Sequence, residues 1–497
     1  MVKKSFDVSV VMKENVELEN AFDDTGHGRY NHILLVTSCM ITIGAVMDML
    51  GYSLVIPAAS CDLNLTLEQG GILKSISFAG YVFAIPWGYI ADTKGRRITI
   101  LVSCTAGFVF SALASFSTTF TMMLVLKFLA SCFSTASLTL ITTYLGESTC
   151  KNKRNKYIFI QNISSTGSDF VCFVLGYLIL PLDFAISVPY LNWYKSWRLF
   201  SFVMSLPLGL GAVMLYFLRE TPKFLVYRGD FDQAIDVLRA MFKTNYGKDK
   251  VYPVISLMKP YKLLESSSFW DSVTRQVTPI FKPPLLWRSL QLFLLLSICC
   301  STNNVFFMWF PTMVNSFFTA SDEDSNFCQK VVANITPIKY NDVCIENSSM
   351  NTIYAGMLLT LLSTSLNIAV IAFANWRRTL IFTFVFVSGV CCITVNMFSD
   401  RIISMVLFCT IQFTLLSLGS IYSYYVDIFP TSCRGLATST GVMIARMFCL
   451  SGVSIVGSTI VDNCELTFYC WAVFLFSGII AAVFLPREAT KQDICKT

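Results

Sequence analysis

The chain has 497 residues, of which 54% are hydrophobic and only 14% are charged. A water-soluble domain carries about 25% charged residues, so this composition excludes an ordinary soluble protein and indicates a chain surrounded mostly by lipid. The net charge of +6 does not indicate a nucleic-acid partner, because the cations are dispersed in short loops. The 18 cysteines show no paired metal-ligand spacing, so no metal or other cofactor is expected.

Apolar stretches of roughly 20 residues, the length that crosses a bilayer as a helix, recur along the whole chain. They predict an all-α membrane protein with twelve transmembrane helices. The predicted spans are 33–57, 70–91, 98–116, 120–143, 157–180, 199–218, 287–312, 352–374, 379–397, 402–425, 435–460 and 466–485. The stretch before the first span has mixed charge and shows no secretory signal peptide.

The charge of the connecting loops predicts the orientation of these helices. One alternating set of loops holds the cations, whereas the other set has almost no Lys or Arg. Because cations are retained on the cytoplasmic side, both termini are expected to be cytoplasmic. The predicted organisation is a cytoplasmic tail at 1–32, a six-helix bundle at 33–218, a central cytoplasmic loop at 219–286, a second six-helix bundle at 287–485 with an outer loop at 313–351, and a cytoplasmic tail at 486–497.

The loops have features of their own. In the central loop, apolar residues recur at helical spacing and predict a short amphipathic helix, at Phe231, Ile235, Leu238 and Phe242. Acceptor triplets for N-glycosylation lie in the predicted outer loops, at Asn64, Asn334 and Asn347. A disulfide between Cys328 and Cys344 is the expected pairing in the long outer loop, with Cys61 as a competing partner.

Two landmarks recur along the chain with nearly the same offset. The segment TYLGE ends the fourth predicted span at Glu147, and YYVDIFP places Asp427 at the end of the tenth, 280 residues later. Arg97 follows the second span, and Arg378 follows the eighth, 281 residues later. Two unrelated landmarks with one offset predict two related six-helix halves.

The stretch GYIADTKGRR, between the second and third spans, holds the most specific motif. It meets the pattern G-x-x-x-D-x-x-G-R-[RK] in full, at Gly88, Asp92, Gly95, Arg96 and Arg97. With its two halves and long central loop, the chain resembles the major facilitator superfamily over nearly its whole length. The segments ETPKFLVYRG and YYVDIFPTSCRG are similar to segments of sugar and organic-ion porters, and ENAFDDTGHGRY and PAASCDLNLT resemble insect relatives of synaptic vesicle glycoprotein 2.

The resemblance implies a cytoplasmic gate that latches the two halves when the cavity opens outward. Asp92 would contact the start of the eleventh helix or Arg434, and the two arginines of the motif would pair with Glu147. Gly88 would allow a close helix crossing. Asp427 stands at the acid position of the second-half segment. The alternative is that the cations of the motif only anchor the topology.

Two opposite charges fall inside predicted spans of the first half. An ionisable group near mid-bilayer needs a partner or a water-filled cavity. Asp48 lies in the first span, and Lys127 lies in the fourth, where the superfamily often has an arginine. In proton-coupled relatives of the sugar-porter kind, such a pair couples substrate to proton. A static buried ion pair and a direct substrate contact remain open as alternatives.

The seventh span gives the substrate-site prediction. Adjacent amides and aromatic residues in mid-span are expected to face inward, where they suit a small organic solute. The alternative is that these polar groups only hold helices together. The candidate substrate residues are Ser301, Asn303, Asn304, Trp309, Gln412, Tyr424 and Arg446.

Three further charges lie within predicted spans. Arg446 either meets an anionic group in the cavity or pairs with a carboxylate of another helix. The role of Asp169 stays open. Lys74 is expected to extend to the lipid headgroups at the outer end of the second span.

These features predict a secondary transporter of a small organic solute that works by alternating access, with protons as a candidate coupling ion. The expected setting is a plasma or vesicle membrane, and the expected functional unit is a monomer in the lipid bilayer. The alternative is a vesicle-type membrane glycoprotein that does not transport and acts as a receptor or partner platform. An enzyme is not expected, because the chain has two histidines and no nucleotide-binding loop.

Overall fold

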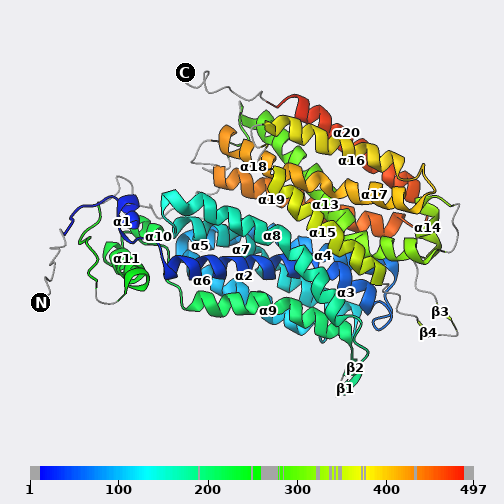
Figure 1. Cartoon of the computed structure of the whole chain (residues 1–497), viewed down its shortest axis with the longest axis horizontal. Helices are drawn as coiled ribbons and strands as arrows, with labels where there is room; N and C mark the ends of the chain where they lie inside the picture. Colours follow the sequence, from blue (N-terminus) through cyan, green and yellow to red (C-terminus); the bar gives the residue numbers. More distant parts are fainter. Residues whose placement is uncertain are drawn as a thin grey trace, which may run out of the picture.

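The computed structural model shows a nearly all-helical molecule. It describes residues 12–188, 191–247, 250–258, 278, 280–283, 285–320, 325–334, 339–340, 343–344, 350–370, 373, 376–429 and 434–485. Two bundles of long helices lie side by side, one from each half of the chain (Figure 1).

The first bundle contains six crossings, and two of them are composite. The first crossing joins α2 to α3, and the second joins α4 to α5 through the 3-10 segment η1. The bounds are α2 Arg29–Leu50, α3 Tyr52–Ala59, α4 Leu67–Ala79, η1 Gly80–Phe83, α5 Ala84–Lys94, α6 Arg96–Ala114, α7 Phe120–Glu147, α8 Lys151–Ile179 and α9 Ser196–Tyr216.

The second bundle repeats the six-crossing plan, with one composite crossing made of α17, η3 and α18. Eleven described helices are long and apolar enough to cross a membrane. The interrupted α4–η1–α5 crossing supplies the twelfth, so the predicted twelve-helix fold is confirmed. The bounds are α13 Leu285–Thr319, α15 Met350–Val370, α16 Arg377–Thr394, α17 Arg401–Ile411, η3 Gln412–Thr414, α18 Leu415–Ile428, α19 Arg434–Thr459 and α20 Cys464–Val483.

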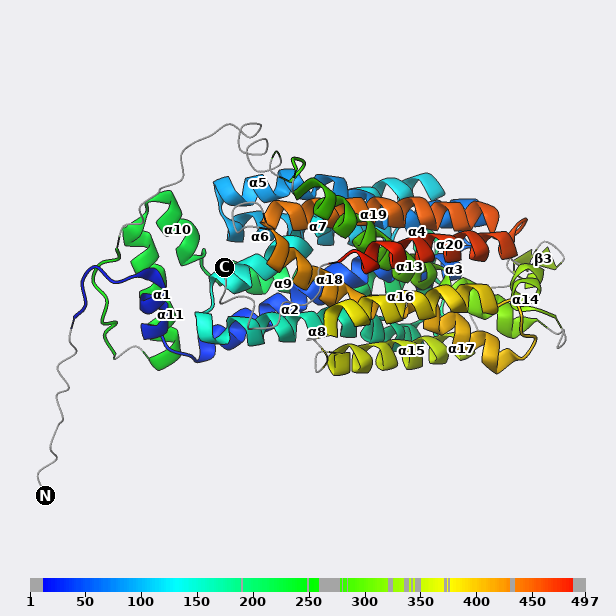
Figure 2. The same ribbon diagram turned by 90° about the horizontal axis from the view of Figure 1, so that it is seen from above.

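Short elements mark the two ends of the molecule. Figures 1 and 2 agree in placing α1, α10 and α11 at one end, which we name the α11 end, and α14 with β3 at the other, which we name the α14 end. The strands form two antiparallel pairs, β1 with β2 and β3 with β4. The bounds are α1 Leu18–Asp24, α10 Pro222–Arg228, α11 Phe231–Tyr246, α14 Phe327–Asn334, β1 Ile186–Val188, β2 Leu191–Tyr194, β3 Lys339–Tyr340 and β4 Val343–Cys344.

Local sequence explains several element boundaries. Thr66 and Gln69 form a reciprocal capping box that starts α4. The side chain of Asp400 accepts two backbone N–H groups and starts α17. Gly95 separates α5 from α6 at a φ of +114°, and Gly229 ends α10 at +92°, which are backbone conformations that side chains disfavour.

The predicted amphipathic helix of the central loop is α11, and its apolar face is buried against the N-terminal segment. Leu238 is fully buried in a cluster that includes Phe22 of α1. Glu19 of α1 pairs with Lys223 at 2.7 Å and with Arg154 at 3.3 Å. Burial raises the pKa of Glu19, but these two cations outweigh burial and the pKa is lowered overall. The N-terminal segment and the start of the central loop therefore form one cap on the first bundle.

The disulfide expected between Cys328 and Cys344 is wrong. Cys328 on α14 is bonded instead to Cys464, the first residue of α20, with a Cα–Cα distance of 5.7 Å. The physical reason is that α14 packs against the start of α20, which brings together two residues 136 positions apart. Cys61 is also disulfide-bonded.

The structure describes the side chain of one of the three predicted glycosylation positions. Asn64 is exposed in the loop before α4. The side chain of Asn334, the last residue of α14, lies outside the described part of the chain, as does Asn347.

Candidate functional site

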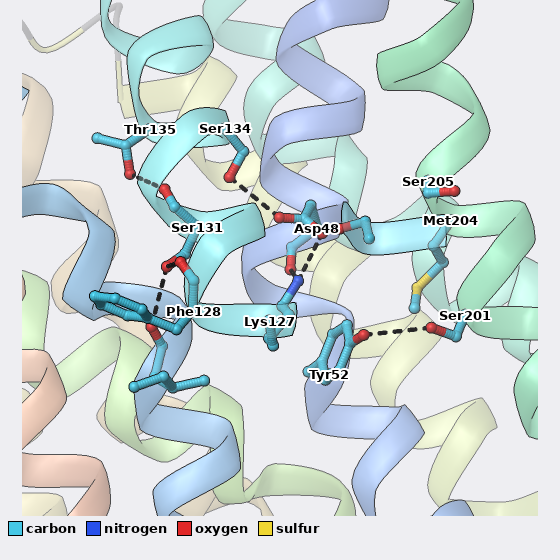
Figure 3. A network of polar contacts seen from close by, with 12 residues as sticks. Asp48, Tyr52, Lys127, Phe128, Ser131, Ser134, Thr135, Ser201, Met204 and Ser205 are labelled. Atoms are coloured by element: carbon cyan, nitrogen blue, oxygen red, sulfur yellow. Dashed lines mark hydrogen bonds and ion pairs between the residues drawn. The ribbon is translucent and has the colours of Figure 1, made fainter. Parts of the chain in front are cut away.

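The two predicted intramembrane charges of the first half meet in a buried network. Lys127 Nζ donates to Asp48 Oδ1 at 2.6 Å and also to the backbone carbonyl of Asp48. Ser111 donates to the same carboxylate oxygen, and Ser134 donates to Asp48 Oδ2 at 3.1 Å (Figure 3). Asp48 is 4% exposed and Lys127 is not exposed at all. The carboxylate is thus fully engaged by one cation and two hydroxyls.

An aromatic side chain completes this network. The ammonium of Lys127 lies 3.9 Å from the centroid of the Tyr52 ring, and the hydroxyl of Tyr52 is 3.4 Å from Ser201 Oγ. The participating helices α2, α3, α6, α7 and α9 all belong to the first bundle. They pack closely, since a Cβ at Gly44 of α2 would overlap the backbone of Leu208 on α9. The network therefore lies within one bundle rather than between the two.

The loop motif at the α11 end makes its contacts within the first bundle. Arg96 pairs with Asp92, four residues earlier, and with Glu147 at the end of α7 at 3.4 Å. Arg97 does not take up the expected partner Glu147. Its backbone N–H instead donates to both carboxylate oxygens of Glu220 at 3.0 Å, and its side chain donates to backbone carbonyls at the end of α9.

Glu220 is a member of this cluster that the motif alone did not reveal, although it opens the segment ETPKFLVYRG. Burial raises the pKa of its carboxyl, against backbone N–H groups of Arg97 and Thr221 that favour the charged form. The carboxylate lies directly at Gly95, where a Cβ would approach Oε2 of Glu220 at 2.6 Å. The glycine of the motif thus makes room for the acid that holds the turn.

The second bundle carries a matching ion pair. Arg377 Nη1 lies 2.5 Å from Asp427 Oδ2 and donates to Ser423 at 2.7 Å. These positions lie about 280 residues after Arg96 and Glu147, so the structure pairs the residues that the internal repeat relates. Asp427 therefore acts within its own bundle. The side chain of Arg434 lies outside the described part of the chain.

The second crossing contacts the other bundle very differently at its two ends. In α4, a Cβ at Gly71 would lie 3.2 Å from the Cα of Gly457 on α19. In α5, a Cβ at Gly88 would meet no described residue within 4 Å, so the described residues show no close crossing there. Asp92 is half-exposed and pairs with Arg96 across the Gly95 turn, within its own bundle. The seam between the bundles is thus tight toward the α14 end and slack at the motif.

Two cross-bundle contacts strengthen the tight part of the seam. Lys74 is 1% exposed, so the expectation that it reaches the headgroups is wrong. Its ammonium donates to Thr312 of α13 at 2.7 Å and lies 3.7 Å from the centroid of the Trp309 ring. At the next residue, Ser75, the hydroxyl of Ser454 on α19 forms a hydrogen bond at 2.9 Å.

The predicted substrate residues lie at different depths rather than in one pocket. Trp309 belongs to the tight seam and donates to the Val453 carbonyl at 3.0 Å. Asn304 is buried and donates to the Cys300 carbonyl of its own helix at 2.6 Å. Tyr424 lies toward the α11 end, under the guanidinium of Arg377 at 5.0 Å.

The remaining candidates separate in the same way. Ser301 lines a hollow between α19 and α20, whose wall includes the exposed side chains Ile455 and Leu466. Gln412 is buried in η3, and its Nε2 has no hydrogen-bond partner among the described residues. Asn303 is half-buried on α13. Only Arg446, in the middle of α19, contacts the other bundle through rings of the second crossing.

Comparison with known proteins identifies this architecture. The profile of the Major Facilitator Superfamily matches residues 39–446, which is most of the chain. The chain belongs to the major facilitator superfamily. This superfamily comprises membrane transporters and not enzymes, and the multi-pass membrane fold of the chain agrees with that assignment.

Relatives within the superfamily include synaptic vesicle glycoproteins. The human synaptic vesicle glycoprotein 2B is 25% identical over 257 residues, which cover 50% of this chain and 37% of the relative. The mouse synaptic vesicle glycoprotein 2C is 26% identical over 255 residues, covering 50% and 35%. The match thus spans little more than a third of these relatives.

Solved structures of superfamily transporters share the fold over almost the whole chain. A partially occluded, inward-open xylose transporter of E. coli has a TM-score of 0.65 at 11% identity, covering 92% of this chain and all of the other. A bacterial homologue of the human lysosomal transporter Spinster, inward-facing and unoccupied, has a TM-score of 0.62 at 14% identity, covering 94% and 100%.

Proposed function

We propose that the chain is a secondary transporter that moves a small organic solute by alternating access, with the α11 end in the cytoplasm. The observation that carries this proposal is the contrast along the second crossing, where Gly71 meets Gly457 but Gly88 meets none of the described residues. A carrier whose two bundles rock about a central site is closed at one end and open at the other. This structure would then be the inward-facing state.

Several features support the orientation and the setting. The loops at the α11 end carry the excess of Lys and Arg, which is retained in the cytoplasm. Glycosylation acceptors and the Cys328–Cys464 disulfide lie toward the other end, where both modifications are chemically possible. The relation to synaptic vesicle glycoproteins favours a vesicle membrane over the plasma membrane. Each chain holds both bundles and their seam, which supports a functional monomer.

Proton coupling through Asp48 and Lys127 is a separate part of the proposal. Coupling requires that protonation of Asp48 releases Lys127, yet Ser111 and Ser134 also hold the carboxylate in place. The contacts therefore favour a fixed ion pair that positions α2 against α7. If the pair couples, uptake in Asp48→Asn loses the pH dependence of the wild type; if the pair is fixed, the pH dependence is retained in any folded variant.

A non-transporting vesicle glycoprotein is the second candidate. The superfamily often has the pattern R-x-x-x-G-x-G in the fourth helix, whereas this chain reads KFLASCF there, and the relatives are named as glycoproteins. Uptake of radiolabelled solutes into proteoliposomes, with and without a proton gradient, separates the two candidates. The transporter proposal expects saturable uptake above protein-free liposomes. Failure across sugars, organic anions and organic cations, in protein shown to be folded, would favour the glycoprotein.

A further inference from the structure

Arg446 lies in the middle of α19, at the seam between the bundles. Its guanidinium carbon lies 5.0 Å from the centroid of the Tyr81 ring and 5.7 Å from that of Phe78. Both rings belong to the second crossing of the other bundle, where η1 interrupts the helix and carries Tyr81. A cation of the second bundle is thus held against aromatic faces of the first.

The guanidinium has no acceptor for part of its hydrogen-bonding surface. The Nε and Nη1 atoms are buried and have no hydrogen-bond partner among the described residues. No described carboxylate forms an ion pair with Arg446, whereas the buried cation Lys127 is paired with Asp48 at 2.6 Å. Aromatic faces attract the charge but do not accept these in-plane N–H groups, so the donors cost free energy in the empty protein.

The described polar groups of α13 and α19 near Arg446 do not accept hydrogen bonds from its Nε and Nη1 atoms. Cys449 lies one turn after Arg446, and its sulfur is 3.9 Å from that of Cys300. Asn304 directs its amide N–H groups to the carbonyl and sulfur of Cys300. The polar contacts at this level therefore join α13 and α19 to each other and supply no anion.

We propose that Arg446 binds the carboxylate of a small organic anion, whose apolar body lies against Phe78 and Tyr81. The planar guanidinium presents paired donors that match the two oxygens of a carboxylate. The inference deepens the proposed function and rests on it, because a solute reaches this seam when the two bundles separate. A bound anion would contact both bundles and accept hydrogen bonds from the Nε and Nη1 groups of Arg446. Binding of the anion would therefore favour closure of the seam between the bundles.

The test measures the melting temperature of the purified full-length protein in detergent with three matched probes: benzoate, benzamide and benzylamine. Benzoate is expected to raise the melting temperature, because a ligand that binds only the folded state stabilises that state. The neutral benzamide and the cationic benzylamine are expected to leave the melting temperature unchanged. In Arg446→Gln the affinity for benzoate is expected to fall by about tenfold or more, since a charge-assisted bidentate contact is lost. Arg446→Lys keeps the positive charge but loses the paired donors of the guanidinium. Its affinity for benzoate should therefore lie between those of the wild type and Arg446→Gln.

The same variants separate a binding role from a structural one. Without ligand, Arg446→Gln should melt no lower than wild type, because it removes an unpartnered buried cation. The control Lys127→Gln should melt lower, because it leaves Asp48 without its cation. A lower melting temperature for unliganded Arg446→Gln would indicate a structural role and overturn the proposal.

Three results with benzoate would also overturn the anion site: no effect on the wild type, an equal effect on Arg446→Gln, or a response to benzylamine in its place. Uptake into proteoliposomes at neutral pH distinguishes this failure from that of the proposed function. Binding of benzoate without uptake would support the anion site and contradict the proposed transport. Uptake of a neutral solute that is unchanged in Arg446→Gln would support transport and contradict the anion site.

Discussion

The two ends of the seam between the bundles are built from the same pair of helical crossings but differ in contact. Toward the α14 end, Gly71 and Gly457 bring α4 and α19 together, and Lys74 extends from one bundle to Thr312 of the other. At the α11 end, Gly88 faces open space and Asp92 turns to Arg96 on its own side. Among the described residues, those that resemble a latch therefore make their ion pairs within one bundle and not across the seam.

This difference teaches that a motif predicts which residues can form a gate, whereas the conformation decides whether the gate is formed. In this structure the arginines of each half are held by acids of the same half, Arg96 by Glu147 and Arg377 by Asp427. Exposed pairs of this kind contribute about 1 kcal/mol or less, so exchanging partners across the seam costs little. The comparison can be tested from both ends.

The largest effect is expected from locking the tight end. Because the hydroxyls of Ser75 and Ser454 are 2.9 Å apart, the double variant Ser75→Cys/Ser454→Cys should form a disulfide under mild oxidant. Oxidation should abolish uptake, and a reductant should restore it. The single variants, treated identically, control for the other cysteines of the chain. Full uptake by the cross-linked protein would show that this end never opens.

A smaller but clear effect is expected from adding bulk at one end and not the other. Gly71→Val forces atoms against Gly457 and the Trp309 ring, and overpacking of this kind costs about 1–3 kcal/mol. Its melting temperature should fall, whereas Gly88→Val, the matched control at the slack end, should melt like the wild type. Equal melting of the two variants would remove the difference in packing on which the comparison rests.

Weaker effects are expected from the two ion pairs at the α11 end. The side chains of Arg96 and Glu147 are 17% and 22% exposed, whereas that of Asp427 is 53% exposed. Because solvent screens an exposed pair, Glu147→Gln should lower stability by about 1 kcal/mol, and Asp427→Asn by less. Chemical unfolding of the two variants checks the order, and the reverse order would contradict it.

The smallest effect concerns pH. Since burial raises the pKa of Glu220 in the folded protein, the folded state binds its proton more tightly than the unfolded state does. Stability contributed by this group is therefore present at low pH and falls as pH rises from the unfolded to the folded pKa. Glu220→Gln should flatten that part of the stability profile, as measured by melting across acidic pH. A profile identical to that of the wild type would exclude this role.

The sequence predicts contacts best where an unpaired group would cost much free energy. Opposite charges inside spans need partners, and Asp48 and Lys127 do meet. It was least informative where the answer depends on packing between distant segments. Lys74 looked close enough to the headgroups to reach them, but the Trp309 ring and Thr312 of the other bundle hold it inside.

The same distinction explains the other outcomes. Cys328 has its partner 136 residues away because α14 folds onto α20, which spacing in the sequence does not reveal. The candidate substrate residues come from the seventh, tenth and eleventh spans, and the structure places them at different depths, which spacing along separate spans does not reveal. The sequence identifies Arg446 as a charge in a span, but the structure is needed to show that it lies against Tyr81 and Phe78 and that no described carboxylate pairs with it.

The cap at the α11 end has a practical consequence for following motion. Glu19 joins the N-terminal segment to α10 and α8, and α11 is buried against the same segment, so these parts travel with the first bundle as one body. A fluorophore on the exposed face of α11, at Arg239, would therefore act as a pointer fixed to that bundle. Its separation from a second dye near the end of α20 would report any movement of one bundle relative to the other, from positions outside the seam.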